Sequence, residues 1–192
     1  MSSLGELDPI TVPDVAEPVL GFRVWRVVEG REPTLWSVTR GEAKKPPRTR
    51  LMLSNPDGAW PPAQTLEATC ELGPLGKVKD HDEQVPDPDC ACGFYATLDL
   101  RVIAAYIRGA PVLGLVQGSG RVIPGAPSST SLGGFRAQRI TIAALFDIAA
   151  DFTVPRRQLR KLADRYQVRL VRPTSDTAED YRELVRSGGS TA

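Results

Sequence analysis

Histidine and cysteine are scarce in this chain: its 192 residues include one histidine and three cysteines. An odd number of cysteines argues against a disulfide framework. No apolar run reaches the length that crosses a bilayer, so we expect no contact with a membrane. Residues 1–18 contain neither a basic segment nor an apolar core. We therefore expect no secretory signal, and a cytoplasmic protein whose thiols stay reduced.

The motifs of several large enzyme classes are also missing. The sequence has no Walker loop, no strand-linked GxGxxG, no GxSxG and no HExxH. Residues 114–120 contain three glycines, but no Lys-Ser or Lys-Thr pair follows them, so a bent strand is the simpler interpretation. If the one histidine, His81, binds a metal, none remains for a Ser/His or Cys/His dyad. These absences favour a function other than catalysis.

The scarce residues are concentrated in one part of the chain. Cys70, His81, Cys90 and Cys92 lie within 23 consecutive residues. Three thiolates and one imidazole are a complete ligand set for a tetrahedral structural zinc ion, so the cluster predicts one bound zinc. Two alternatives stay open: the cysteines are small buried apolar residues beside a solvated histidine, or two of them form a redox pair. A metal with an incomplete set of protein ligands would leave a position for catalytic water.

Hydrophobic and turn patterns predict an α+β fold, a mainly antiparallel sheet with three short helices, stapled by the Cys3His metal site. Strand patterns cover residues 21–29, 35–40, 49–53, 65–72, 112–123, 135–146 and 168–171, with a further extended piece at 90–96. Helical patterns cover residues 100–108, 154–166 and 177–185. We expect a single domain over residues 19–186, a loose tail over 1–18 and a frayed end over 187–192.

Charge is unevenly distributed along the chain. Residues 1–96 hold 10 Lys/Arg against 15 Asp/Glu, whereas residues 97–192 hold 14 against 8. Seven basic residues and one acidic residue fall between positions 156 and 172. The candidate contacts to a nucleic acid or an acidic partner are Arg156, Arg157, Arg160 and Lys161 of the predicted helix. The alternative is the solvated outer face of an ordinary amphipathic helix.

Several segments carry a resemblance to a known family. The most specific are Gly21-Phe-Arg-Val-Trp-Arg26, Leu66-Glu-Ala-Thr-Cys70, and His81 followed by Pro88-Asp-Cys-Ala-Cys-Gly-Phe-Tyr-Ala96. The others are Trp60-Pro-Pro62, Gly118-Ser-Gly-Arg-Val-Ile123, Gly134-Phe-Arg-Ala137 and Leu162-Ala-Asp-Arg-Tyr166. On these segments the chain resembles a Cys/His-containing family of uncharacterised proteins from actinobacteria and their phages, over about residues 20–170. The resemblance implies that the three cysteines and the histidine form one unit, and it implies no activity.

Our leading hypothesis is a non-enzymatic, zinc-stabilised domain that binds another macromolecule in regulation or in phage–host interaction, with an unidentified protein as its partner. The first alternative is a nucleic-acid-binding protein that uses the basic 156–172 stretch. The second alternative is a metal-dependent enzyme with an open coordination position. Binding assays and metal analysis distinguish the three hypotheses.

Overall fold

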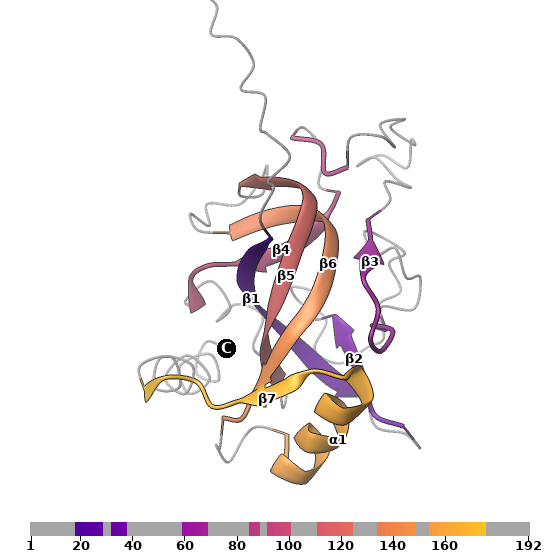
Figure 1. Cartoon of the computed structure of the whole chain (residues 1–192), viewed down its shortest axis with the longest axis vertical. Helices are drawn as coiled ribbons and strands as arrows, with labels where there is room; N and C mark the ends of the chain where they lie inside the picture. The colour runs from indigo at the N-terminus through magenta and orange to yellow at the C-terminus, as the bar shows by residue number, and fades with distance from the viewer. Residues whose placement is uncertain are drawn as a thin grey trace, which may run out of the picture.

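The computed structural model describes residues 18–28, 32–37, 59–68, 85–88, 92–100, 111–124, 134–148 and 154–175. Seven strands and one α-helix lie in these ranges (Figure 1). They are β1 (Val19–Val28), β2 (Thr34–Ser37), β3 (Leu66–Glu67), β4 (Phe94–Thr97), β5 (Pro111–Pro124), β6 (Gly134–Phe146), α1 (Arg156–Tyr166) and β7 (Arg169–Val171).

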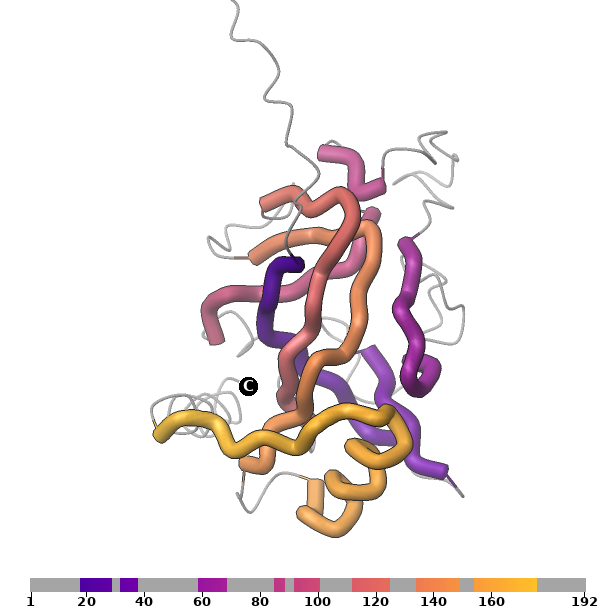
Figure 2. The backbone as a smooth tube through the Cα atoms, in the orientation of Figure 1, coloured from indigo at the N-terminus to yellow at the C-terminus, as the bar shows by residue number. Residues whose placement is uncertain are grey.

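Four of the strands form a closed ring of antiparallel pairs. β5 pairs with β1 and with β6, β6 pairs with β4, and β4 pairs back to β1 at Phe22 and Thr97. β2 extends the ring beside β1, while β3 pairs with β6 in antiparallel and β7 pairs with β6 in parallel. β5 and β6 run side by side as two long curved strands (Figure 2). The sequence predicted these two strands within one residue at each end.

Glycines allow the long strands to curve around the core. The register of β5 against β6 shifts between Leu115 and Val116 and again between Ser119 and Val122, as expected where strands bend. A Cβ at Gly118 would lie 2.5 Å from Cε2 of Phe135, so only glycine leaves room for that ring. The interpretation of residues 114–120 as a bent strand is confirmed.

The core contains three aromatic rings, of which Trp60 contacts the other two. Trp25 and Trp60 meet edge to face with ring centroids 5.4 Å apart, and Trp60 meets Phe94 at 6.1 Å. Such pairs add about 0.5–1.5 kcal/mol beyond the burial of their area. Aliphatic side chains from β2, β5, β6 and α1 complete this core, among them Leu35, Val116, Ile140, Leu145, Leu159 and Leu162.

One face of α1 is buried against the sheet. Leu159, Leu162, Ala163 and Tyr166 are all buried, which confirms the apolar stripe predicted from their spacing. The Tyr166 hydroxyl donates to the Trp60 carbonyl at 2.7 Å and accepts from the Leu35 N–H at 2.9 Å. This one side chain therefore joins the helix to two other segments of the fold.

Alkaline pH tests this junction. Burial raises the pKa of Tyr166 above its ordinary value of 10.0, and the Leu35 N–H and the Arg165 charge offset part of that rise. The folded state thus holds the neutral phenol more firmly than the unfolded chain does. Its contribution to the free energy of unfolding is fully present below pH about 10 and is lost as the pH rises through the raised folded pKa. In denaturant titrations, the free energy of unfolding of Tyr166→Phe should fall less than that of the wild type as the pH rises over this range. Equal losses in the two proteins would contradict the prediction.

The predicted fold needs correction in two respects. The described residues form a mostly antiparallel sheet with one helix, not a sheet with three short helices. They also contain no group of three or more His, Cys, Asp or Glu side chains that could hold a metal, so the predicted Cys3His staple is not part of the described fold. Of the strand predicted over 65–72, residues 69–72 lie outside the described residues; β3 covers Leu66–Glu67, and the Ala68 N–H donates to the Gln138 carbonyl at 2.8 Å.

Several predictions fall on other parts of the chain. The strand at 49–53, the helix at 177–185 and the tail at 187–192 lie outside the described residues, as does the tail at 1–18 except for residue 18. Of the helix predicted over 100–108, only Leu100 is described. Asp99, directly before this range, bonds to Thr97: its N–H donates to the Thr97 hydroxyl at 3.0 Å, and that hydroxyl donates to the Asp99 carbonyl at 2.9 Å.

Candidate nucleic-acid interface

Of the four predicted metal ligands, the structure describes only Cys92. Cys70, His81 and Cys90 lie outside the described residues. Cys92 is buried just before β4, packs with Val85 and Ala68, and its Sγ accepts a hydrogen bond from the Asp87 N–H at 3.3 Å. A single described cysteine forms no metal site, so the zinc ion stays a prediction from the sequence.

Arg136 of β6 organises the segment around Cys92. Its side chain is only 2% exposed. The guanidinium donates to three backbone carbonyls, those of Asp87 at 3.1 Å, Cys92 at 3.2 Å and Pro88 at 3.4 Å. The planar guanidinium of arginine carries five N–H groups, so it can donate to several carbonyls at once. A lysine ammonium group has all its N–H groups on one nitrogen and cannot reproduce this geometry. No sequence pattern indicates this role, because arginines are rarely buried.

Arg23 of β1 is a second arginine held within the fold. Its guanidinium donates to the Tyr95 carbonyl and to the Ser37 hydroxyl, the latter at 3.2 Å, and lies 4.9 Å from the centroid of the Trp60 ring. The Trp60 indole N–H donates to the same Ser37 oxygen at 2.8 Å. Arg23 and Arg136 therefore stabilise the fold, and the cations accessible to a partner lie elsewhere.

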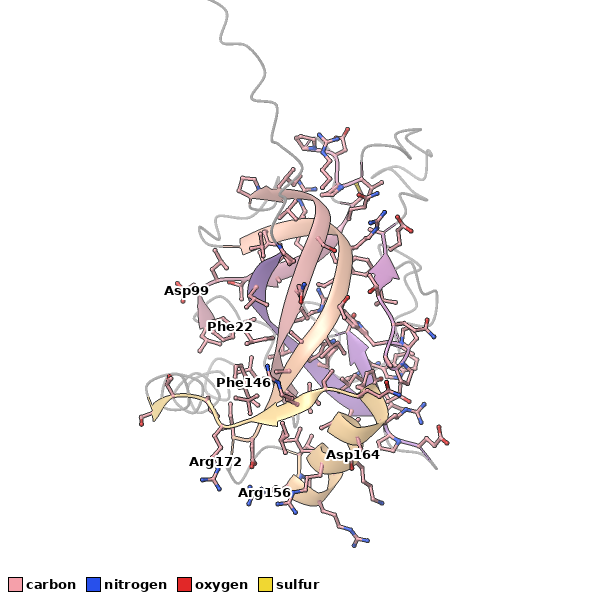
Figure 3. The ribbon with its side chains drawn as sticks, viewed as in Figure 1. Phe22, Asp99, Phe146, Arg156, Asp164 and Arg172 are labelled. Atoms are coloured by element: carbon pink, nitrogen blue, oxygen red, sulfur yellow. The ribbon has the colours of Figure 1, made fainter. Side chains whose placement is uncertain are left out.

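Four exposed cations of the described residues lie together on the outer face of α1. Arg156, Arg157, Arg160 and Lys161 are all exposed. At 3.6 residues per turn these four residues cover an arc of roughly 140°, opposite the buried stripe. Figure 1 shows α1 at one end of the molecule, and in Figure 3 Arg156 projects from the helix on the lower side of the view, as does Arg172 from the segment after β7. The sequence predicted this basic face, and the structure confirms its exposure.

Only some of these cations are paired. Arg156 Nη2 lies 2.8 Å from Asp147 Oδ2, a carboxylate that is 10% exposed, and Arg165 pairs with Glu32. Within the described ranges, Arg157, Arg160 and Lys161 have no hydrogen-bond or ion-pair partner beyond the helix backbone. Exposed Arg169 and Arg172 have none there either. Asp147, the partner of Arg156, directly follows β6, and the pairing depends on how the chain turns between that strand and α1.

The start of α1 is electrostatically unfavourable for the fold itself. The helix begins after Pro155, and within the described residues no side-chain hydrogen bond caps its free N–H groups. Its first turn holds two arginines and no acid, although the positive end of the helix dipole favours acids there by about 0.3–1 kcal/mol each. Asp147 offsets the charge of Arg156, but within the described residues no carboxylate pairs with Arg157. A negatively charged ligand beside Arg157 would relieve the repulsion between its guanidinium and the positive end of the helix dipole.

Comparisons with known proteins give no further guidance. No family model, no curated protein and no solved structure matches the chain. The resemblance to the actinobacterial and phage family therefore stays a prediction. No helix in the described part of the chain is long and apolar enough to span a membrane.

Proposed function

We propose that this protein is a non-enzymatic domain that binds a nucleic acid through the basic face of α1. The observation that carries the proposal is the group of Arg157, Arg160 and Lys161, exposed on one ordered helix and unpaired within the described residues. Arginine and lysine on one helix face can neutralise phosphates and release condensed counterions, which supplies most of the affinity for nucleic acid. Such binding would serve a regulatory or phage–host role in the cytoplasm, the compartment predicted from the sequence.

The position of Arg157 favours a ligand over a merely solvated face. A helix surface needs charge for solubility, but an acid in the first turn would supply it and also stabilise the helix. The chain instead holds a cation where local electrostatics disfavours one. Residues that lower stability without a compensating contact are typical of functional sites.

Salt-dependent association tests the proposal. If three cations each neutralise one phosphate of a duplex, log K should fall with log[salt] with a slope of about −3, or about 40-fold between roughly 50 and 200 mM salt. Fluorescence anisotropy with a labelled DNA of random sequence measures the slope. Absence of binding at the lowest salt, or tight binding to an acidic protein in its place, would overturn the proposal.

Zinc content is a separate prediction that the binding function does not require. Elemental analysis of the purified protein should find about one zinc per chain, the stoichiometry of a structural site. Cys92→Ser should reduce it, because the thiolate is the form of cysteine that binds metal. A metal-free wild type, or unchanged metal in the variant, would contradict the prediction made from the sequence.

A further inference from the structure

We infer that α1 lies in the major groove of double-stranded DNA, with cations on its two flanks contacting the phosphates of the two strands. This inference rests on the proposed function and names its partner. The major groove of B-DNA is about 12 Å wide and admits an α-helix, whereas that of duplex RNA is too deep and narrow for side chains to read. Three features of the helix point to this partner.

The first feature is the division of the basic face into two rows. Arg156 and Arg160 are four residues apart along one side of the exposed arc, and Arg157 and Lys161 are four residues apart along the other. Members of a row are separated by about 6 Å along the helix axis, which is on the order of two base-pair steps. A helix in the groove has the phosphates of one strand on each side. Arg160 would face one strand, and Arg157 and Lys161 would face the other, while Arg156 stays paired with Asp147.

The second feature is the residue between the rows. Asp164 is the only acid of α1, it is exposed, and it projects about midway between the two rows. In a groove-bound helix this position faces the floor, where base edges replace phosphates. A carboxylate accepts a hydrogen bond from the amino group of cytosine, which lies in the major groove. On the phosphate backbone itself an acid would only be repelled.

The third feature is the lack of a stacking surface. Proteins that bind single strands combine a basic groove with exposed aromatic rings on which bases stack. The only aromatic residue of α1 is Tyr166, which is 2% exposed and committed to Trp60 and Leu35, and β7 has no aromatic residue. In this part of the described chain only charge is available, and Arg169 and Arg172 extend it beyond the helix. Charge without stacking suits the phosphates of a duplex.

Competition binding tests the inference. The purified full-length chain is titrated into a labelled DNA duplex, the corresponding single strand and an RNA duplex, at one low salt concentration. DNA duplex should bind at least about tenfold tighter than the other two, and a major-groove dye should displace the protein while a minor-groove ligand should not. Arg160→Ala and Lys161→Ala, one from each row, should weaken duplex binding and each lower the salt slope by about 1.

Two variants complete the design. Arg139→Ala is the matched control, because Arg139 is 51% exposed on β6, compared with 52% for Arg156, but lies outside α1. It should leave duplex affinity within about twofold. Asp164→Asn should tighten binding to all duplexes and reduce any preference for cytosine-containing sites. Equal binding of single strands, or displacement by the minor-groove ligand, would overturn the groove assignment and leave the proposed function standing. No binding to any of the nucleic acids would overturn both.

Discussion

Replacing Arg157, Arg160 and Lys161 together with glutamate is expected to reduce DNA affinity by at least about 1000-fold. A hydrogen bond to a charged group contributes about 1.5–3 kcal/mol, so loss of three exceeds the roughly 4 kcal/mol that corresponds to this factor. The reversed charges add repulsion from the phosphates. Anisotropy titrations of the variant and the wild type at low salt measure the loss. Retention of affinity within tenfold would show that the face is only solvated surface.

Thermal melting of the same variants separates binding from folding. In the described structure none of the three side chains is paired, so removing them should break no contact. Arg157→Glu alone places an acid in the uncapped first turn of α1 and should raise the melting temperature by about 1–4 °C. Arg156→Glu is its neighbouring control: it sets two carboxylates against each other at Asp147 and should lower the melting temperature. If Arg157→Glu destabilises the protein, Arg157 serves the fold and not a ligand.

Local patterns predicted the parts of this fold that depend on local geometry. The spacing of Leu159, Leu162 and Tyr166 defines the buried stripe of α1, and β-branched runs define β5 and β6. Closure of the ring depends instead on one pairing between Phe22 and Thr97, which are distant in the sequence. Periodicity cannot specify such a contact, because many strand orders bury the same faces.

One part of the candidate site follows from local patterns, and another depends on the tertiary fold. The basic face of α1 follows from helical periodicity alone, and the sequence predicted all four of its residues. The pairing of Arg156 with Asp147 does not follow from periodicity, because it requires the residue after β6 to lie beside the start of α1. The zinc prediction rests on proximity along the chain, and the structure describes only Cys92 of its four residues. Clustering in sequence brings ligands together only if the intervening chain folds back on itself.

Arg136 provides the largest expected effect on stability. Replacing it with methionine leaves three backbone carbonyls, those of Asp87, Pro88 and Cys92, without their guanidinium donor. A buried carbonyl that is left without a hydrogen-bond donor costs about 1–3 kcal/mol of the free energy of unfolding. Because two of these bonds lie in partly buried surroundings where water can substitute, we expect a total loss of about 3–5 kcal/mol. Chemical denaturation monitored by tryptophan fluorescence measures the loss.

Arg136→Lys distinguishes the shape of the side chain from its charge. Lysine keeps the positive charge, but its single ammonium nitrogen cannot direct parallel N–H groups at three separate carbonyls. We therefore expect a loss at least half as large as that of the methionine variant, whereas Arg139→Met, which removes only an exposed pair with Glu67, should cost less than about 1 kcal/mol. Full stability in the lysine variant would mean that charge alone suffices. A large loss there would establish that the segment before β4 is fixed to β6 by the geometry of one guanidinium.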